Sequence, residues 1–172
     1  MSWTAPEIER TDPPRTGDER ACLEGWLRYH RDTLLWKCAG LDHERLAARS
    51  APPSALSLLG LVRHMADVER WWFRTNLRGE DVEGFFGPED NITGDFDDLD
   101  SMPAEQVWDV YARECADADA AAEGVPLEQT FRTRRGTELD LRWVYLHMIE
   151  EYARHNGHAD ILRECIDGVV GD

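Results

Sequence analysis

Four segments of the chain repeat apolar residues at the three- and four-residue spacing of an α-helix, and this periodicity restricts the possible folds more than any other feature. Ser54 and Asp140 stand where N-caps of the second and fourth helices are expected, and Gly40, Gly79 and Gly168 follow the ends of three helices. The expected helices span residues 18–39, 54–77, 103–123 and 141–167.

The segments between these helices carry the residues of turns and loops. Residues 1–17 contain several prolines and are expected to form a flexible N-terminal arm before a helical domain over residues 18–172. Residues 80–101 are acidic and glycine-rich, which indicates a long loop, and Thr130–Arg134 is a short extended piece. With no strong strand pattern and no internal repeat, the sequence predicts an all-α fold, an antiparallel four-helix bundle with long connecting loops.

The charge balance excludes two classes of partner. The 172 residues include 35 acidic and 19 basic side chains, a net charge of −16. Such a field repels phosphate backbones and anionic lipid surfaces, so nucleic-acid and membrane roles are not expected. The first 20 residues do not resemble a signal peptide, and no window is long and apolar enough to span a membrane. A cytoplasmic protein is therefore expected.

The four cysteines do not form a metal-binding or secretory pattern. They are widely separated, with no C-x-x-C pair, which argues against a structural zinc ribbon. Because nothing else indicates secretion, reduced, buried thiols are expected at Cys22, Cys38, Cys115 and Cys165.

The last predicted helix carries a face of metal-competent side chains. At about 100° per residue, His147, Glu151, His155 and His158 fall within roughly 80° of one another. Glu151 and His155 are four residues apart, so both can reach one ion. The alternative is a solvated face of charge-paired residues, but the apolar residues around it leave little room for a fully exposed helix.

A third ligand is expected from the second helix, where His64 stands in an apolar stretch. His64, Glu151 and His155 give three protein ligands without a thiolate, the pattern of a catalytic zinc site with an open position. Nickel, iron(II), manganese and cobalt also tolerate these ligands, and His147 could replace Glu151. Otherwise His147 and His158 are expected to support the ligands, face the substrate or serve the structure alone.

At these residues the chain resembles the DinB-like superfamily of metal-binding four-helix bundles, specifically its mycothiol S-transferase branch, formerly a family of unknown function. The resemblance rests on SALSLLGLVRHMADVERWWF at residues 54–73 and LRWVYLHMIEEYARHNGHADILRE at residues 141–164. It extends over nearly the whole chain from about residue 20. It implies a zinc-type ion that binds the thiol cofactor mycothiol, and an actinobacterial host.

One ligand position departs from the commonest pattern of the superfamily. Many members carry an H-x-x-x-H pair on the last helix, whereas here Glu151 replaces the first histidine. The related mycothiol-dependent maleylpyruvate isomerases have the same replacement. Those enzymes have an extra C-terminal domain that this chain lacks, so isomerase activity is not expected.

These observations favour a thiol S-transferase of a detoxification type, which binds a small-molecule thiol at the metal and transfers it to an electrophile. Trp71, Trp72 and Trp143 could line an apolar mouth for the electrophile, although aromatic residues on helices more often pack in the core. Two alternatives stay open. One is a metal-dependent hydrolase with His158 or Asp67 as base. The other is a non-catalytic metal-binding stress protein, with a homodimer as one arrangement.

Overall fold

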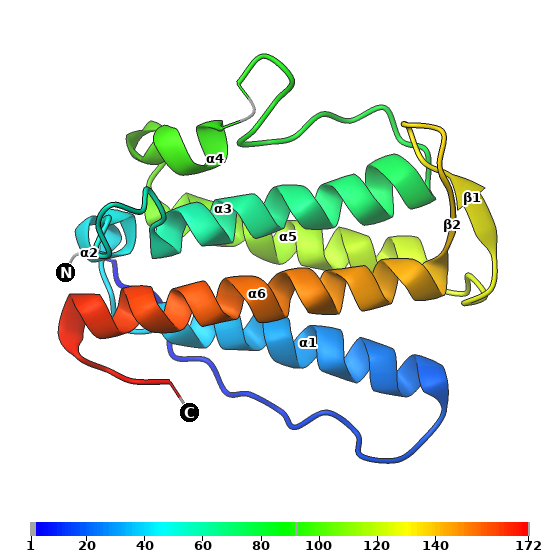
Figure 1. Cartoon of the computed structure of the whole chain (residues 1–172), viewed down its shortest axis with the longest axis horizontal. Helices are drawn as coiled ribbons and strands as arrows, with labels where there is room; N and C mark the ends of the chain where they lie inside the picture. Colours follow the sequence, from blue (N-terminus) through cyan, green and yellow to red (C-terminus); the bar gives the residue numbers. More distant parts are fainter. Residues whose placement is uncertain (1–2, 92, 172) are drawn as a thin grey trace.

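Four long helices lie side by side in the computed structural model of the chain (Figure 1). The structure describes residues 3–91 and 93–171. Met1, Ser2, Ile92 and Asp172 belong to the expected arm and helical domain but lie outside the described residues. The long helices are α1 (Glu19–Cys38), α3 (Leu58–Glu69) with its π-helical continuation η1 (Arg70–Leu77), α5 (Ala104–Ala122) and α6 (Leu141–Asp167). The predicted all-α class is confirmed.

The helices form two pairs that run in opposite directions. Helices α1 and α6 run the same way beside each other, as do α3 and α5, while α3 is antiparallel to α6 (Figure 1). Because α3 and α5 are parallel, residues 80–103 must return along the length of α3. We call residues 80–103 the crossover segment; its length follows from this topology.

The helix ends follow from local capping. The side chains of Asp18 and Asp140 accept hydrogen bonds from backbone N–H groups in the first turns of α1 and α6. The expected cap Ser54 is wrong: Ser57 Oγ accepts the N–H of Gly60 at 3.0 Å and begins α3. Gly168 ends α6 with a φ of 79°, a left-handed conformation that glycine adopts without steric cost.

Several short elements were not expected from the sequence. Helix α2 (His43–Ala47) lies in the connector before α3, and α4 (Gly94–Asp97) and the 3₁₀ turn η2 (Leu99–Ser101) lie in the crossover segment. The extended piece forms β1 (Thr130–Arg132), which pairs antiparallel with β2 (Glu138–Asp140). This hairpin lies at the end of the bundle where α3 and η1 finish (Figure 1).

Part of the expected N-terminal arm lies against the bundle. Residues 3–17 form no helix or strand. The backbone N–H of Ala5 nevertheless donates to the carbonyl of Leu41 at 2.9 Å, and that of Gly40 donates to Ala5 at 2.8 Å. Ala5 is buried, so this point of the segment is held on the loop that follows α1.

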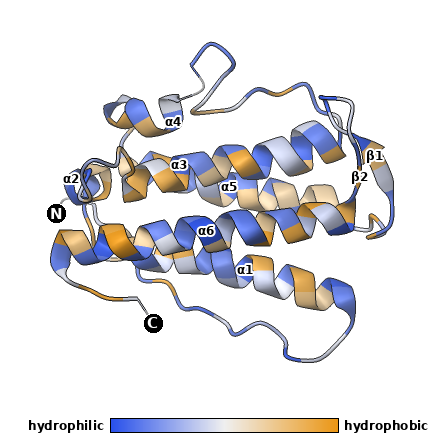
Figure 2. Ribbon diagram, in the orientation of Figure 1, coloured by the Kyte–Doolittle hydropathy of each residue, from blue (hydrophilic) through white to orange (hydrophobic). Residues whose placement is uncertain are grey.

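Polar contacts from α3 hold the crossover segment, which is mostly hydrophilic (Figure 2). Arg63 is buried, and its guanidinium donates to the carbonyls of Gly94 and Asp98 at 2.8 and 2.7 Å. Asp67, one turn further along α3, and Arg70, at the start of η1, also bond this segment. One face of α3 therefore positions the crossover segment through hydrogen bonds rather than through apolar packing.

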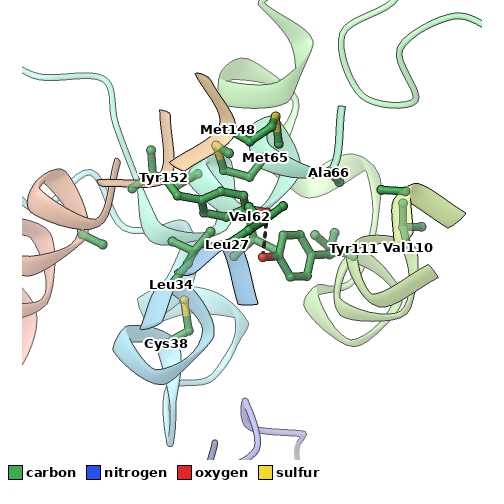
Figure 3. Close-up of a cluster of buried hydrophobic side chains, with 14 of the residues drawn as sticks. Leu27, Leu34, Cys38, Val62, Met65, Ala66, Val110, Tyr111, Met148 and Tyr152 are labelled. Atoms are coloured by element: carbon green, nitrogen blue, oxygen red, sulfur yellow. Dashed lines mark hydrogen bonds between the residues drawn. The ribbon is translucent and has the colours of Figure 1, made fainter. Parts of the chain in front are cut away.

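Apolar side chains from all four long helices fill the core (Figure 3). Leu27 and Leu34 come from α1, Met65 from α3 and Met148 from α6, and each is at most 1% exposed. None of the described helices has the length and apolar character that a membrane crossing requires.

A charged pair is buried within this core. Glu69 is fully buried, and Arg31 donates to its two oxygens at 2.7 Å each. The hydroxyl of Tyr152 donates to the same carboxylate at 2.8 Å and lies 2.9 Å from the hydroxyl of Tyr111. Each of the four long helices contributes one member, so these residues fix the helices relative to one another.

Candidate metal centre

The three residues expected to bind a metal come together at the seam between α3 and α6. His64, Glu151 and His155 each offer a ligand atom, and these atoms all lie within 4.8 Å of one another. Ligand atoms about 2.1 Å from one zinc ion can be no more than about 4.2 Å apart, so only a small contraction would be needed. His155 Nε2 is already 3.5 Å from Glu151 Oε2.

His64 is oriented by a carboxylate from the crossover segment. Its Nδ1 lies 2.8 Å from Oδ2 of Asp95, which is 6% exposed. Phe96 packs against the ring, with the two ring centroids 5.2 Å apart. The bond to Asp95 occupies Nδ1 and leaves Nε2 to face an ion. A carboxylate on the far nitrogen is the usual partner of a metal-binding histidine, and it raises the basicity of the ligand.

His155 has a comparable partner on its own helix. Its Nδ1 lies 3.4 Å from Nδ1 of His158, one turn further along α6, while its Nε2 faces Glu151. Burial first, and the neighbouring His64 and His158 second, together lower the pKa of His155 to about 4. The ring is therefore neutral at pH 7, the form in which histidine binds metals.

The ligand residues remain accessible from outside. The side chains of His64, Glu151 and His155 are 26%, 16% and 12% exposed, so a small molecule can approach their ligand atoms. A cavity of about 500 Å³ begins at His64 and Asp95 and follows α3 toward the β-hairpin. Small-molecule sites in proteins commonly measure roughly 300–1,000 Å³.

His147 belongs to an aromatic cluster beside this site. Its ring stacks on Trp143, with centroids 4.8 Å apart and planes 14° from parallel, and Trp72 packs against it at 4.7 Å. Its Nε2 lies 4.0 Å from Glu151 Oε1. Among the described residues, His147, Glu150 and Glu151 form a second group with ligand atoms within 4.8 Å. His147 is thus next to the ligand set but outside the first group.

The three tryptophans that could line an apolar mouth, Trp71, Trp72 and Trp143, lie in different places in the structure. Trp71 lines the cavity, whereas Trp143 is 40% exposed on the surface of α6. Trp72, in η1, contacts Trp143 of α6 with ring centroids 5.1 Å apart. The three side chains therefore do not form a single mouth around the ligand residues.

Asp67 also lines the cavity, but its carboxylate serves the backbone. It accepts the N–H groups of Phe85, Phe86 and Gly87 at 2.5, 2.9 and 2.7 Å. Burial raises its pKa, although these three hydrogen bonds lower it. A Cβ at Gly84 would lie 2.5 Å from the carbonyl oxygen of Gly87, so this turn depends on glycine. With both oxygens bonded, Asp67 holds the crossover segment and is poorly placed as a base.

Sequence reasoning missed Asp95. The crossover segment contains many acidic residues, and no local pattern separates Asp95 from its neighbours. Its role depends on α4, which was not expected, and on Arg63, which fixes the start of that helix. One signal was available: Arg63 stands beside His64 in an apolar helix, and a buried arginine needs hydrogen-bond acceptors. That need indicates that another segment of the chain packs next to His64.

The family model described as mycothiol-S-transferase matches residues 22–168. No curated protein matches the chain. The matched range contains α1, α3, η1, α5 and α6 almost entirely, and with them all three residues of the first metal-competent group. The chain belongs to the mycothiol S-transferase family.

Proposed function

We propose that this protein is a metal-dependent thiol S-transferase, which binds mycothiol through its sulfur at His64, Glu151 and His155 and transfers it to an electrophile. The observation that carries the proposal is the convergence of these three residues, of which His64 lines a cavity. The family match supports the thiol and the class of reaction. In this proposal the protein acts in the cytoplasm, where thiols are kept reduced.

The ligand residues suit zinc. Two neutral imidazoles and one carboxylate leave one position of a tetrahedral zinc site for an exogenous ligand, and nickel, iron(II), manganese or cobalt would accept the same donors. An ion held there would stabilise a bound sulfur as thiolate. Asp95 and His158 fix the rings of His64 and His155 so that both present Nε2.

The proposed transfer needs an ionised thiol and an electrophile with a leaving group. In the proposed transfer the thiol proton passes to water, a sulfur lone pair forms the bond to the electrophilic carbon, and the leaving group departs with the electrons of the broken bond. Glu151 and His155 would hold the ion, together with His64, at the α3–α6 seam, where the sulfur would bind. No protein base is required, because the thiol is already ionised when it reacts.

A thiol panel tests the proposal. Metal-loaded protein should accelerate conjugation of mycothiol to a bimane or nitroaryl electrophile at neutral pH, with glutathione a poor substitute. The Glu151→Ala/His155→Ala double variant should lose this acceleration. Equal uncatalysed rates with every thiol and several electrophiles would overturn the proposal. Consumption of the electrophile without any thiol would instead indicate hydrolysis.

A further inference from the structure

The cavity beside His64 has a chemical character that the proposed reaction leaves unexplained. It lies along α3 beneath the crossover segment and reaches the turn of the β-hairpin, where Arg134 and Arg135 line it. Trp71 and Val68 contribute an apolar wall. The far part of the cavity is therefore distant from the ligand residues: Trp71 follows His64 by seven residues, roughly 10 Å along the helix.

The hairpin is held firmly at this position. Asn76, in the π-helical η1, accepts the backbone N–H of Arg134 through Oδ1 at 2.9 Å and donates through Nδ2 to the carbonyl of Trp71 at 2.7 Å. The guanidinium of Arg134 pairs with Asp81 at 2.5 Å. Asn76 thus links the hairpin turn to the part of the helix that carries Trp71.

Arg135 is in a different situation from Arg134. Its guanidinium lies over the ring of Trp71, 5.5 Å from the centroid, and within residues 3–91 and 93–171 it has no hydrogen-bond or ion-pair partner. Glu83 and Glu89, both exposed, also line the cavity, and their carboxylates have no hydrogen-bond or ion-pair partner in that part of the chain. Unpaired charged residues of both signs therefore line the same cavity as the ring of Trp71.

This combination selects the chemistry of the ligand. The other charged residues of the lining, Arg70, Arg134, Asp67 and Asp95, are already bonded within the chain. Of the unpaired ones, Glu83 and Glu89 would repel a carboxylate or phosphate, and Arg135 would repel a cation. A neutral polyol suits both, because each hydroxyl can donate to a carboxylate and accept from a guanidinium. The ring of Trp71 offers an apolar face against which the C–H groups of a sugar can pack.

We infer that this cavity binds the sugar rings of a sugar-based thiol, with Trp71 packed against one ring and Arg135, Glu83 and Glu89 bonded to its hydroxyls. The inference rests on the proposed function, since the sulfur of the same molecule would lie at His64. The roughly 10 Å between His64 and Trp71 along the helix matches a ligand whose sulfur and sugar rings are at opposite ends.

The first experiment uses a probe without sulfur. Binding of glucosaminyl-inositol, the thiol-free sugar part, is measured by calorimetry with metal-free and with metal-loaded protein. Binding is expected in both forms. Arg135→Ala should weaken it about tenfold, the loss expected for one hydrogen bond to a charged group. Arg132→Ala is the matched control on the same hairpin: Arg132 bonds the carbonyl of Gly136, does not line the cavity, and should bind the sugar like the parent protein.

A second experiment separates this inference from the transferase proposal. Cobalt-loaded protein is titrated with mycothiol and with N-acetylcysteine amide, which has the sulfur but no sugar, and the thiolate-to-cobalt absorption band is followed. Mycothiol should bind more tightly, and Trp71→Leu or Arg135→Ala should reduce this preference about tenfold while leaving the small thiol unaffected.

The outcomes are distinct. The assignment of the cavity is wrong if the sugar alone does not bind, or if it binds equally to all variants. It is also wrong if both thiols produce the band with equal affinity, and in that case the transferase proposal stands. If the sugar binds through Arg135 and neither thiol produces the band, the assignment holds and the transferase proposal fails.

Discussion

Asp95 Oδ2 lies 2.8 Å from Nδ1 of His64, so a residue of the crossover segment orients a candidate ligand on α3. Asp95→Ala should weaken metal affinity by roughly 10–100-fold, the usual effect of removing such a partner, while Asp95→Asn should retain more affinity because its carbonyl still accepts. Competition with a chromogenic chelator measures the affinity.

Asp97→Ala is the control for this substitution. Asp97 lies on the same short helix, but its side chain is 55% exposed and bonds Arg49. It should retain the affinity of the parent protein. Equal losses in the Asp95 and Asp97 variants would show that the effect comes from disturbing α4 and not from the bond to His64.

Neighbouring glutamates on α6 distinguish the two metal-competent groups. Glu151 belongs to both, whereas Glu150 belongs only to the group around His147 and its side chain is 51% exposed. Glu151→Ala should abolish stoichiometric metal binding, and Glu150→Ala should leave one ion per chain. Metal analysis after gel filtration, with circular dichroism to verify the fold, decides this. Loss of the ion in the Glu150 variant would place the centre around His147.

The long helices could be read from the sequence because their apolar spacing and caps are local signals. The predicted start and end of α6 agree with the structure, since Asp140 and Gly168 mark both. Ser54 was expected to cap the second helix, whereas Ser57, a residue of the same type three positions later, caps α3; only packing chooses between them. The π-helical η1 and the parallel direction of α3 and α5 depend on tertiary contacts, which periodicity does not encode.

The convergence of His64, Glu151 and His155 could be predicted from the sequence, but their surroundings could not. Helical spacing brought Glu151 and His155 together, and one histidine in an apolar helix supplied the third. Asp95 and Arg135 come from segments that read as loops, where a residue's neighbours are decided by how the loop docks. Asp67 was considered as a base because its sequence position gave no sign of its three backbone partners.

The expectation that all four cysteines are buried is wrong, since Cys38 is buried, Cys22 and Cys115 are half-buried and Cys165 is exposed. The thiols of Cys38 and Cys115 should be unreactive in the folded protein. Burial raises the pKa of Cys38 and of Cys115 to about 12, so near pH 8 only about one molecule in 10,000 carries the thiolate. Because the folded pKa is raised, this protection should persist until the pH approaches 12 or the chain unfolds. Brief alkylation at pH 8 followed by mass spectrometry should label exposed Cys165 first. Labelling of Cys38 or Cys115 at the rate of Cys165 would contradict this expectation.

The buried pair of Arg31 and Glu69 should be costly to break. Glu69→Gln leaves the guanidinium of Arg31 without its main partner in the core, which should lower the free energy of unfolding by roughly 3–5 kcal/mol. Glu80→Gln breaks a pair with Arg74 whose acidic side is 41% exposed, and should change stability by at most about 1 kcal/mol. Urea titrations of both variants provide the comparison, and similar values for the two would show that Glu69 is not essential to the core.

The most direct test of the central claim is the absorption spectrum of the cobalt-loaded protein titrated with mycothiol. If His64, Glu151 and His155 hold an ion with a position open to sulfur, a thiolate-to-cobalt band should appear and saturate at one thiol per chain. The Glu151→Ala/His155→Ala double variant should show no such band. A spectrum that mycothiol leaves unchanged in the parent protein, or a band that persists in the double variant, would contradict a thiol-binding metal centre at these residues.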